Sequence, residues 1–130
     1  MKKIFRLLSI ALVALVFTAC ASSTPEAATK KYLQCMQKGD YAAMLDHMYF
    51  KNGLTDEQKA ELLGMIEEKA KTEVEKKGGI ASFEIGATEM AEDGQTANVS
   101  YTLTYGDGST KEDNEDLIQV DGKWMVNSGK

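Results

Sequence analysis

The chain contains few of the residues from which catalytic and metal sites are usually built. Its 130 residues include one histidine, two cysteines, one tryptophan and one proline. So few histidines and cysteines exclude a clustered zinc site, and no glycine-rich loop precedes a helix to hold a phosphate. No second member supports a Ser/His/Asp or Cys/His arrangement. We therefore predict no metal, no cofactor and no catalytic residue.

Positive charge is also scarce. The sequence has 15 Lys and Arg against 20 Asp and Glu, and its formal net charge is −5. Three of the basic residues, Lys2, Lys3 and Arg6, precede the first apolar run. Without those three, 12 basic residues face 20 acidic ones, a net charge of −8. This excess of negative charge disfavours nucleic acid and anionic lipid headgroups as partners.

Residues 7–19 form an apolar run, broken by Ser9 and Thr18, and no comparable run follows. As a helix it would rise roughly 20 Å, which is short of the ~30 Å hydrocarbon core of a bilayer. A basic start, a short apolar region and an exit of small residues are typical of an export signal.

The residue that follows this run is Cys20, and two kinds of processing fit it. Residues 17–20 (FTAC) resemble the bacterial lipobox, whose cysteine thiol receives a diacylglycerol and becomes the new N-terminus. Residues 19–21 (ACA) also fit the A-x-A pattern, which would release a soluble chain beginning at Ser22. The position of Cys20 directly after the apolar run favours lipidation.

The lipobox interpretation predicts a three-part organisation. Residues 1–19 would be a lipoprotein signal peptide, residues 20–24 a lipidated tether, and residues 25–130 a single domain. We expect the protein in the cell envelope, anchored to the membrane by its lipid and facing the periplasm or the exterior. Only Cys35 would then remain as a free thiol, and its place among apolar residues predicts a core position.

Three helices are predicted in the first half of this domain. Thr24 can cap the first helix, which Gly39 ends, and Asp40 can cap the second. Residues 55–58 (TDEQ) form a capping box that begins a third helix, which Gly78 stops. Apolar residues at helical spacing continue through the whole second helix: Tyr41, Met44, Leu45, Met48 and Tyr49.

From residue 80 onward the apolar period changes from 3.6 to 2, which predicts strands. Asp-Gly pairs at 93–94, 107–108 and 121–122 are hairpin-turn signals. They predict a meander of four antiparallel strands, and the fold class α+β with the N-terminal helices packed on one face. The residues expected on that face are Phe83, Ile85, Val99, Leu103, Ile118, Val120 and Trp124, with Tyr101 and Tyr105 as the polar groups.

The order of these elements resembles a known family. The stretches TPEAATKKYLQCMQKGDYAAMLDHMY, EKKGGIASFEI, DGQTANVSYTLTYGDGS and VDGKWMV are similar to small bacterial lipoproteins grouped as domain of unknown function 4878, in the nuclear-transport-factor-2-like (NTF2-like) superfamily. The resemblance implies a cone-like α+β fold, in which a strongly curved sheet wraps around helices and often leaves a pocket. It implies no activity, because this superfold carries enzymes, binding modules and dimerisation domains.

The chemistry-bearing residues each have a more ordinary interpretation. His47 lies off the apolar stripe of its helix, so we expect it on the surface rather than in a site. The acidic run at 112–116 fails the spacing of a calcium loop, and we expect a solvated strand that protects a sheet edge. No carboxylate is expected on the apolar face of the sheet, so no acid–base pair is predicted there.

Two functions remain. The first is a lipid-anchored, non-catalytic binding or interaction module, which holds a small, largely apolar, neutral or cationic ligand in the cone or contacts a protein partner or a second copy of the chain. The alternative is an isomerase- or dehydratase-like enzyme on the same fold. The residues predicted to line a pocket, which would serve a filled core equally well, are Tyr32, Met36, Tyr41, Met48, Tyr101, Tyr105 and Trp124, with Met44 beside them.

Overall fold

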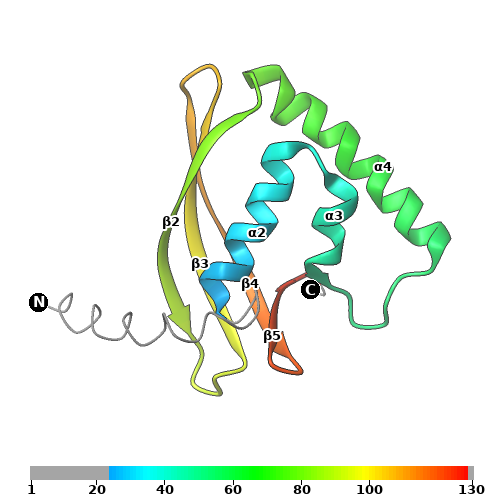
Figure 1. Ribbon diagram of the computed structural model, residues 1–130, viewed down its shortest axis with the longest axis vertical. Coiled ribbons are helices and arrows are strands. Elements are labelled where there is room, and N and C mark those ends of the chain that lie inside the picture. Colours follow the sequence, from blue (N-terminus) through cyan, green and yellow to red (C-terminus); the bar gives the residue numbers. More distant parts are fainter. Residues whose placement is uncertain (1–23, 129–130) are drawn as a thin grey trace, which may run out of the picture.

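The computed structural model describes residues 24–128, in which helices pack against one face of a five-stranded sheet (Figure 1). The predicted signal peptide, and Cys20 with most of the tether, lie outside the described residues. The elements in chain order are α2 (Pro25–Lys38), α3 (Tyr41–Asp46), β1 (Met48–Tyr49), α4 (Asp56–Glu73), the 3₁₀ turn η1 (Glu75–Lys77), β2 (Ile80–Met90), β3 (Thr96–Tyr105), β4 (Thr110–Val120) and β5 (Lys123–Asn127).

The predicted helix caps are confirmed. Thr24 accepts a hydrogen bond from the Ala27 amide at 3.1 Å, and Gly39 ends α2 in the left-handed conformation. The capping box of α4 is complete, since Thr55 and Gln58 each bond the backbone of the other. Because these residues satisfy the amides at the helix starts, local sequence alone determines where the helices begin.

The second helix is shorter than its apolar spacing predicts. It ends at Asp46, and Met48–Tyr49 form β1, which pairs in parallel with β5. The amide of Val126 donates to the carbonyl of His47 at 2.9 Å. Hydrogen bonding to a strand nearly 80 residues away therefore overrides the helical period.

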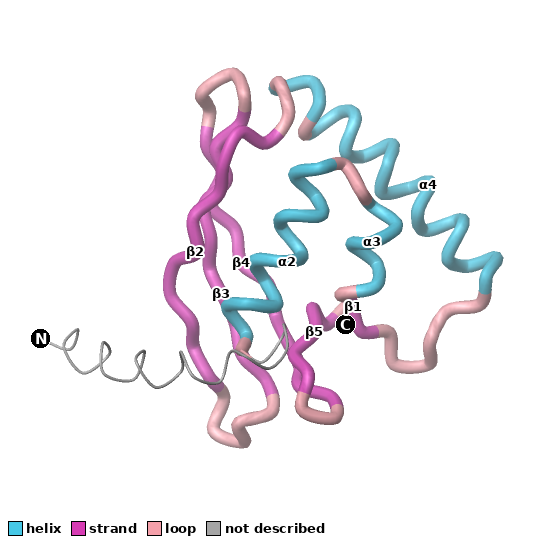
Figure 2. Tube along the Cα trace, viewed as in Figure 1, coloured by secondary structure: helices cyan, strands magenta, loops and turns pink. Residues whose placement is uncertain are grey.

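The sheet contains the predicted antiparallel meander and one additional strand. Its order is β1-β5-β4-β3-β2, so the four predicted strands are neighbours in sequence order and β1 adds a parallel edge. The Asp-Gly turns join these strands as predicted, and Gly94, Gly108 and Gly122 all have positive φ. Figure 2 shows the helices gathered on one side of the strands, which we call the inner face.

The core lies where α2 crosses the inner face. Leu33 of α2, Val99 of β3 and Leu117 of β4 are fully buried. Trp124 of β5 is also buried in this cluster, at 4 % exposed. The polar hydroxyl of Thr29 is accommodated because it donates to the Pro25 carbonyl at 2.9 Å.

The predicted inner face of β4 is wrong by one residue. Leu117 is fully buried, whereas Ile118 is only partly buried. Because side chains alternate along a strand, the inward positions before Leu117 are 115, 113 and 111. The register agrees, since Glu115 is paired with Val99 and Asp113 with Tyr101. The expectation that no carboxylate shares the inner face is therefore wrong.

The segment that follows α4, from η1 to Gly79, is joined tightly to the β3–β4 hairpin. The amide of Gly106 donates to the Gly79 carbonyl at 2.8 Å, and the amide of Asp107 donates to the Lys77 carbonyl at 2.9 Å. A Cβ at Gly106 would overlap the carbonyl oxygen of Gly78. Only glycine permits this approach of two backbones, which fixes the position of α4 relative to the sheet.

Candidate functional site

A hollow of about 330 Å³ lies between the helices and the inner face of β3 and β4. We call it the inner hollow. Its wall is formed by helices α2, α3 and α4, by strand β1, and by strands β3 and β4. Its lining residues are Tyr32, Met36, Tyr41, Met44, Met48, Leu62, Ile66, Lys69, Ala70, Glu73, Val74, Tyr101, Leu103, Tyr105, Lys111, Asp113 and Glu115.

Most of the residues predicted to line a pocket lie in this wall. Trp124 does not, because β5 places it in the core beside α2. Binding of a ligand by the remaining residues stays a prediction. The predicted residues found in the wall are Tyr32, Met36, Tyr41, Met44, Met48, Tyr101 and Tyr105.

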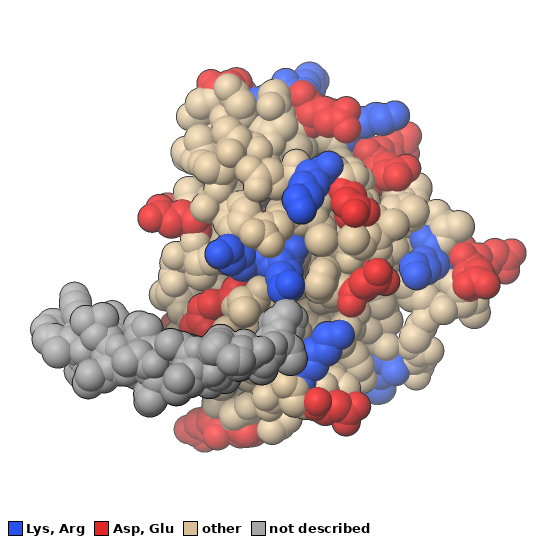
Figure 3. Space-filling model, viewed as in Figure 1, with Lys and Arg blue, Asp and Glu red and all other residues tan. Residues whose placement is uncertain are grey.

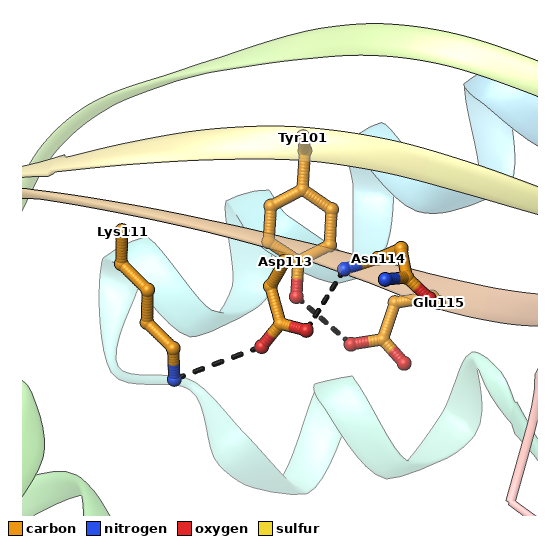
Figure 4. Close-up of polar contacts among 5 residues, drawn as sticks. All are labelled: Tyr101, Lys111, Asp113, Asn114 and Glu115. Carbon is orange, nitrogen blue, oxygen red and sulfur yellow. Dashed lines mark hydrogen bonds and ion pairs between the residues drawn. The ribbon is translucent and has the colours of Figure 1, made fainter.

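The polar centre of the inner hollow is a tyrosine–carboxylate pair. The hydroxyl of Tyr101 on β3 donates to Glu115 Oε2 on β4 at 2.9 Å. Tyr101 is only 4 % exposed and Glu115 is half-buried. Figure 4 shows both side chains projecting from neighbouring strands toward the same side of the sheet. A charged acceptor makes this a stronger hydrogen bond than a neutral pair would give.

A second carboxylate lies beside this pair, nearer to solvent. Asp113 accepts from the backbone amide of Asn114 at 2.8 Å, and one of its oxygens lies 3.6 Å from Lys111 Nζ (Figure 4). The Asp113 and Lys111 side chains are 44 % and 46 % exposed, so their ion pair is weak. The two carboxylates therefore differ: Asp113 has a lysine beside it, and Glu115 lies deeper against a tyrosine.

Sequence reasoning missed Lys111, Asp113 and Glu115 as site residues. These three residues are charged and the residues between them are also polar. This part of the strand therefore lacks the apolar alternation that marks an inward face. A signal was nevertheless present: counting back in twos from Leu117 gives these three positions. The acidic run is solvated on its other face, where Glu112 and Asp116 are exposed. The expectation that this strand protects a sheet edge is wrong, because β4 is the middle strand of the sheet.

The buried tyrosines of the inner hollow resist ionisation. Burial raises the pKa of Tyr101 far above its ordinary value, and the neighbouring Glu115 raises it further by its charge and by accepting the hydrogen bond. The pKa of Tyr32 is raised in the same way, first by burial and then by the charges of Glu115 and Asp113. Both groups are therefore neutral hydroxyls at physiological pH.

Several tyrosine hydroxyls in the wall have unused hydrogen-bonding capacity. Within residues 24–128 no hydrogen bond is made by the hydroxyl of Tyr32, Tyr41 or Tyr105. In the same part of the chain, Thr88 Oγ1 is the sole side-chain polar atom that is both sealed from solvent and without a partner. The tyrosine hydroxyls therefore reach solvent, which they can do through the inner hollow.

The other candidate residues lie outside the inner hollow. His47 is half-buried at the end of α3, and its pKa is lowered by burial and then by Lys31 and Lys123. Cys35 is half-buried at the margin of the core, less deeply than predicted, and burial raises its pKa. Neither residue belongs to the wall.

Neither metal coordination nor membrane spanning is indicated by the described part of the chain. Residues 24–128 contain no group of three or more His, Cys, Asp or Glu side chains that could hold a metal ion. No helix among them is long and apolar enough to cross a bilayer. On the molecular face in Figure 3, acidic and basic side chains are interspersed rather than separated by sign.

Helices packed on the inner face of a curved meander, with a hollow between them, define the NTF2-like class. A crystal structure from Campylobacter jejuni, provisionally described as an NTF2-like transpeptidase, matches this chain with a TM-score of 0.66. The match covers 80% of this chain and 97% of that one at 17% identity. At this identity the likeness shows the fold alone.

The family follows from the sequence. The model of the domain of unknown function DUF4878 matches residues 18–127, and this chain belongs to that family. The family resemblance and the α+β, NTF2-like fold predicted from the sequence are thus confirmed. No curated protein matches the chain significantly.

Proposed function

We propose that this protein is an exported, lipid-anchored binding module that holds a small, largely apolar ligand in the inner hollow. The observation that carries the proposal is the hollow itself, because apolar and aromatic side chains with a few convergent polar groups are the usual composition of a small-molecule site. Its methionines, Met36, Met44 and Met48, suit an adaptable apolar surface. The net negative charge favours a neutral or cationic ligand over an anion.

Binding is tested by reducing the volume of the inner hollow. Ala70 of α4 lies in the wall and is 6 % exposed, so Ala70→Leu places extra carbon atoms in the hollow. Ala60→Leu, at an exposed position of the same helix, is the matched control. We expect native mass spectrometry and thermal shift with a panel of lipids and metabolites to find a ligand for wild type and Ala60→Leu. Ala70→Leu should lose it while keeping its circular dichroism spectrum.

No compound bound by wild type, or equal binding by all three proteins, would contradict the proposed site. In that case the inner hollow is a packing irregularity and the surface serves protein contacts instead.

The anchor is tested separately at Cys20. We expect mass spectrometry of the mature N-terminus to find a diacylglycerol-modified cysteine in the cell envelope fraction. Cys20→Ala should leave the precursor uncleaved or shift cleavage to follow Ala21. An unmodified wild-type chain beginning at Ser22 would overturn the lipoprotein interpretation without affecting the hollow.

The Tyr101–Glu115 pair favours one second candidate, an isomerase- or dehydratase-like enzyme. A half-buried carboxylate within hydrogen-bond distance of a tyrosine is able to abstract a proton from a substrate held in the hollow. The transpeptidase description of the structural neighbour is not supported in this way, because no serine, threonine or cysteine lies in the wall.

The enzyme candidate is tested by proton exchange. If Glu115 is a base, the protein should speed deuterium incorporation from D₂O into the α-carbons of small ketones, observed by NMR. Glu115→Gln should abolish the acceleration. A wild-type rate equal to buffer across the ketone panel leaves the binding module as the supported function.

A further inference from the structure

We propose that the ligand of the inner hollow is a protonated amine on an apolar body, with its ammonium group against Glu115. This inference rests on the proposed function and names the class of ligand. It is built from the charges of the wall, the unused tyrosine hydroxyls and the division of the hollow into polar and apolar parts.

The charges of the wall favour a cation. The hollow is lined by two lysines, Lys69 and Lys111, and by three carboxylates, Glu73, Asp113 and Glu115. The wall therefore has one excess negative charge. Lys111 lies beside Asp113 near solvent, with 3.6 Å between the charged atoms. Glu115 lies deeper, so a cation that reaches it interacts through a less aqueous medium than one at the rim.

The tyrosines provide what a protonated amine needs beyond opposite charge. An ammonium group with hydrogens has three donors and no acceptor. Glu115 and the oxygen of Tyr32 can accept from it. Tyr32 is 7 % exposed, lies in the wall and makes no hydrogen bond within residues 24–128. Aromatic rings beside the site also attract a cation.

Tyr101 acts as a positioning residue in this arrangement. Its hydroxyl donates to Glu115 Oε2, which holds the carboxylate toward the hollow and leaves its negative charge in place. Since the pKa of Tyr101 is raised, it remains a donor to Glu115 at any physiological pH.

The apolar part of the hollow selects the rest of the ligand. Met36 of α2, Met44 of α3 and Ile66 of α4 lie in the same wall as the polar groups. A compact body of one ring or a short alkyl chain can contact these side chains while its amine reaches β4. A free metal ion would use none of this apolar surface.

Three probes of nearly equal size and different charge test the inference. Isothermal titration calorimetry of the purified protein with 2-phenylethylammonium, 2-phenylethanol and 3-phenylpropanoate compares cation, neutral and anion. We expect the ammonium to bind roughly tenfold or more tighter than the alcohol, the scale of one charge-assisted hydrogen bond. The carboxylate should bind weakest.

Matched variants locate the effect. Glu115→Gln keeps an acceptor for Tyr101 but removes the charge, and should reduce the preference for the ammonium over the alcohol to near unity. Glu112→Gln removes a carboxylate from the exposed face of the same strand and should leave the preference unchanged. Circular dichroism confirms that each variant is folded.

The outcomes separate this inference from the proposed function. Equal binding of ammonium and alcohol by wild type overturns the amine inference and leaves an apolar binding module. A preference retained in Glu115→Gln also overturns it, because the charge then acts elsewhere. Binding of none of the three probes, nor of any compound in the wider panel, would count against the binding module itself.

Discussion

At the residue scale, the sheet positions Tyr101 and Glu115 so that one hydrogen bond serves both stability and the proposed site. Tyr101 brings a large apolar surface into the core and its hydroxyl needs a partner there. Glu115 provides that partner at 2.9 Å. A carboxylate on the inner face is thus tolerated because it is hydrogen-bonded and still borders the hollow.

The sequence predicted the tyrosines of the wall but not the carboxylates. Tyr101 follows the clear alternation of β3, whose odd positions are buried from Ala97 to Tyr105. Strand β4 has no such alternation before Leu117. The apolar residues Ile118 and Val120 suggested instead that the even-numbered positions face inward. Because a shift of one residue exchanges the two faces of a strand, this small error hid Glu115.

The raised tyrosine pKa values predict loss of stability at high pH. Below about pH 10 both states keep the Tyr32 and Tyr101 protons. Above it the unfolded chain releases them while the folded protein does not, so the free energy of unfolding falls by about 1.4 kcal/mol per pH unit for each tyrosine. Urea unfolding between pH 8 and 11 measures this slope. The double variant with phenylalanine at both positions should show a shallower fall, and an unchanged slope would contradict the burial argument.

Replacement of glycine by alanine should have opposite effects on stability at two positions, Gly106 and Gly64. Gly106→Ala places a methyl group against the Gly78 carbonyl and should destabilise the fold by about 1–3 kcal/mol, as overpacking does. Gly64→Ala meets nothing within 4 Å on the exposed side of α4 and should stabilise by about 0.5–1 kcal/mol. Chemical denaturation of both variants tests the pair. A neutral Gly106→Ala would show that the hairpin and η1 separate easily.

At the element scale, local signals predicted the helix starts and the hairpin turns. Pairing between strands far apart in the sequence, which local signals do not reveal, added β1 and shortened α3. Thr24, Thr55 and the Asp-Gly turns act within a few residues, so their effect can be read directly from sequence. Strand β1 forms because its backbone pairs with β5, where the amides of Val126 and Ser128 donate to the carbonyls of His47 and Tyr49. Along α4, Ala70 alone is buried, and Met65 is 62 % exposed.

This exposure predicts that α4 is less protected from hydrogen exchange than α2 and β3. Helix α2 has five buried residues and α4 has one, so α4 has less packing to lose when it opens. We expect hydrogen exchange with mass spectrometry to show faster exchange in α4 than in α2 and β3. Equal protection of the two helices would contradict this account, whereas slowing of exchange in α4 by a ligand would agree with its place in the wall.

At the scale of the whole molecule, the fold concentrates different chemistry on the two faces of one sheet. Alternation along β3 and β4 gives an outer face of mostly Ser, Thr, Asn and acidic residues and an inner face of apolar residues and tyrosines with Lys111, Asp113 and Glu115. The helices do not pack tightly on all of the inner face, and the space left between them and strands β3 and β4 is the hollow. The family and fold were predictable from the order of elements, whereas the hollow depends on how far α4 lies from the sheet.

The central claim, that the inner hollow binds a small apolar amine, is tested most directly by an NMR titration. Backbone and methyl spectra of the protein are recorded with increasing 2-phenylethylammonium. The account predicts saturable shifts at residues of the wall, including Met44, Ile66, Tyr101 and Glu115, with the outer-face residues Thr102 and Glu112 unchanged. Shifts confined to the outer face, or none at saturating concentration, would contradict it.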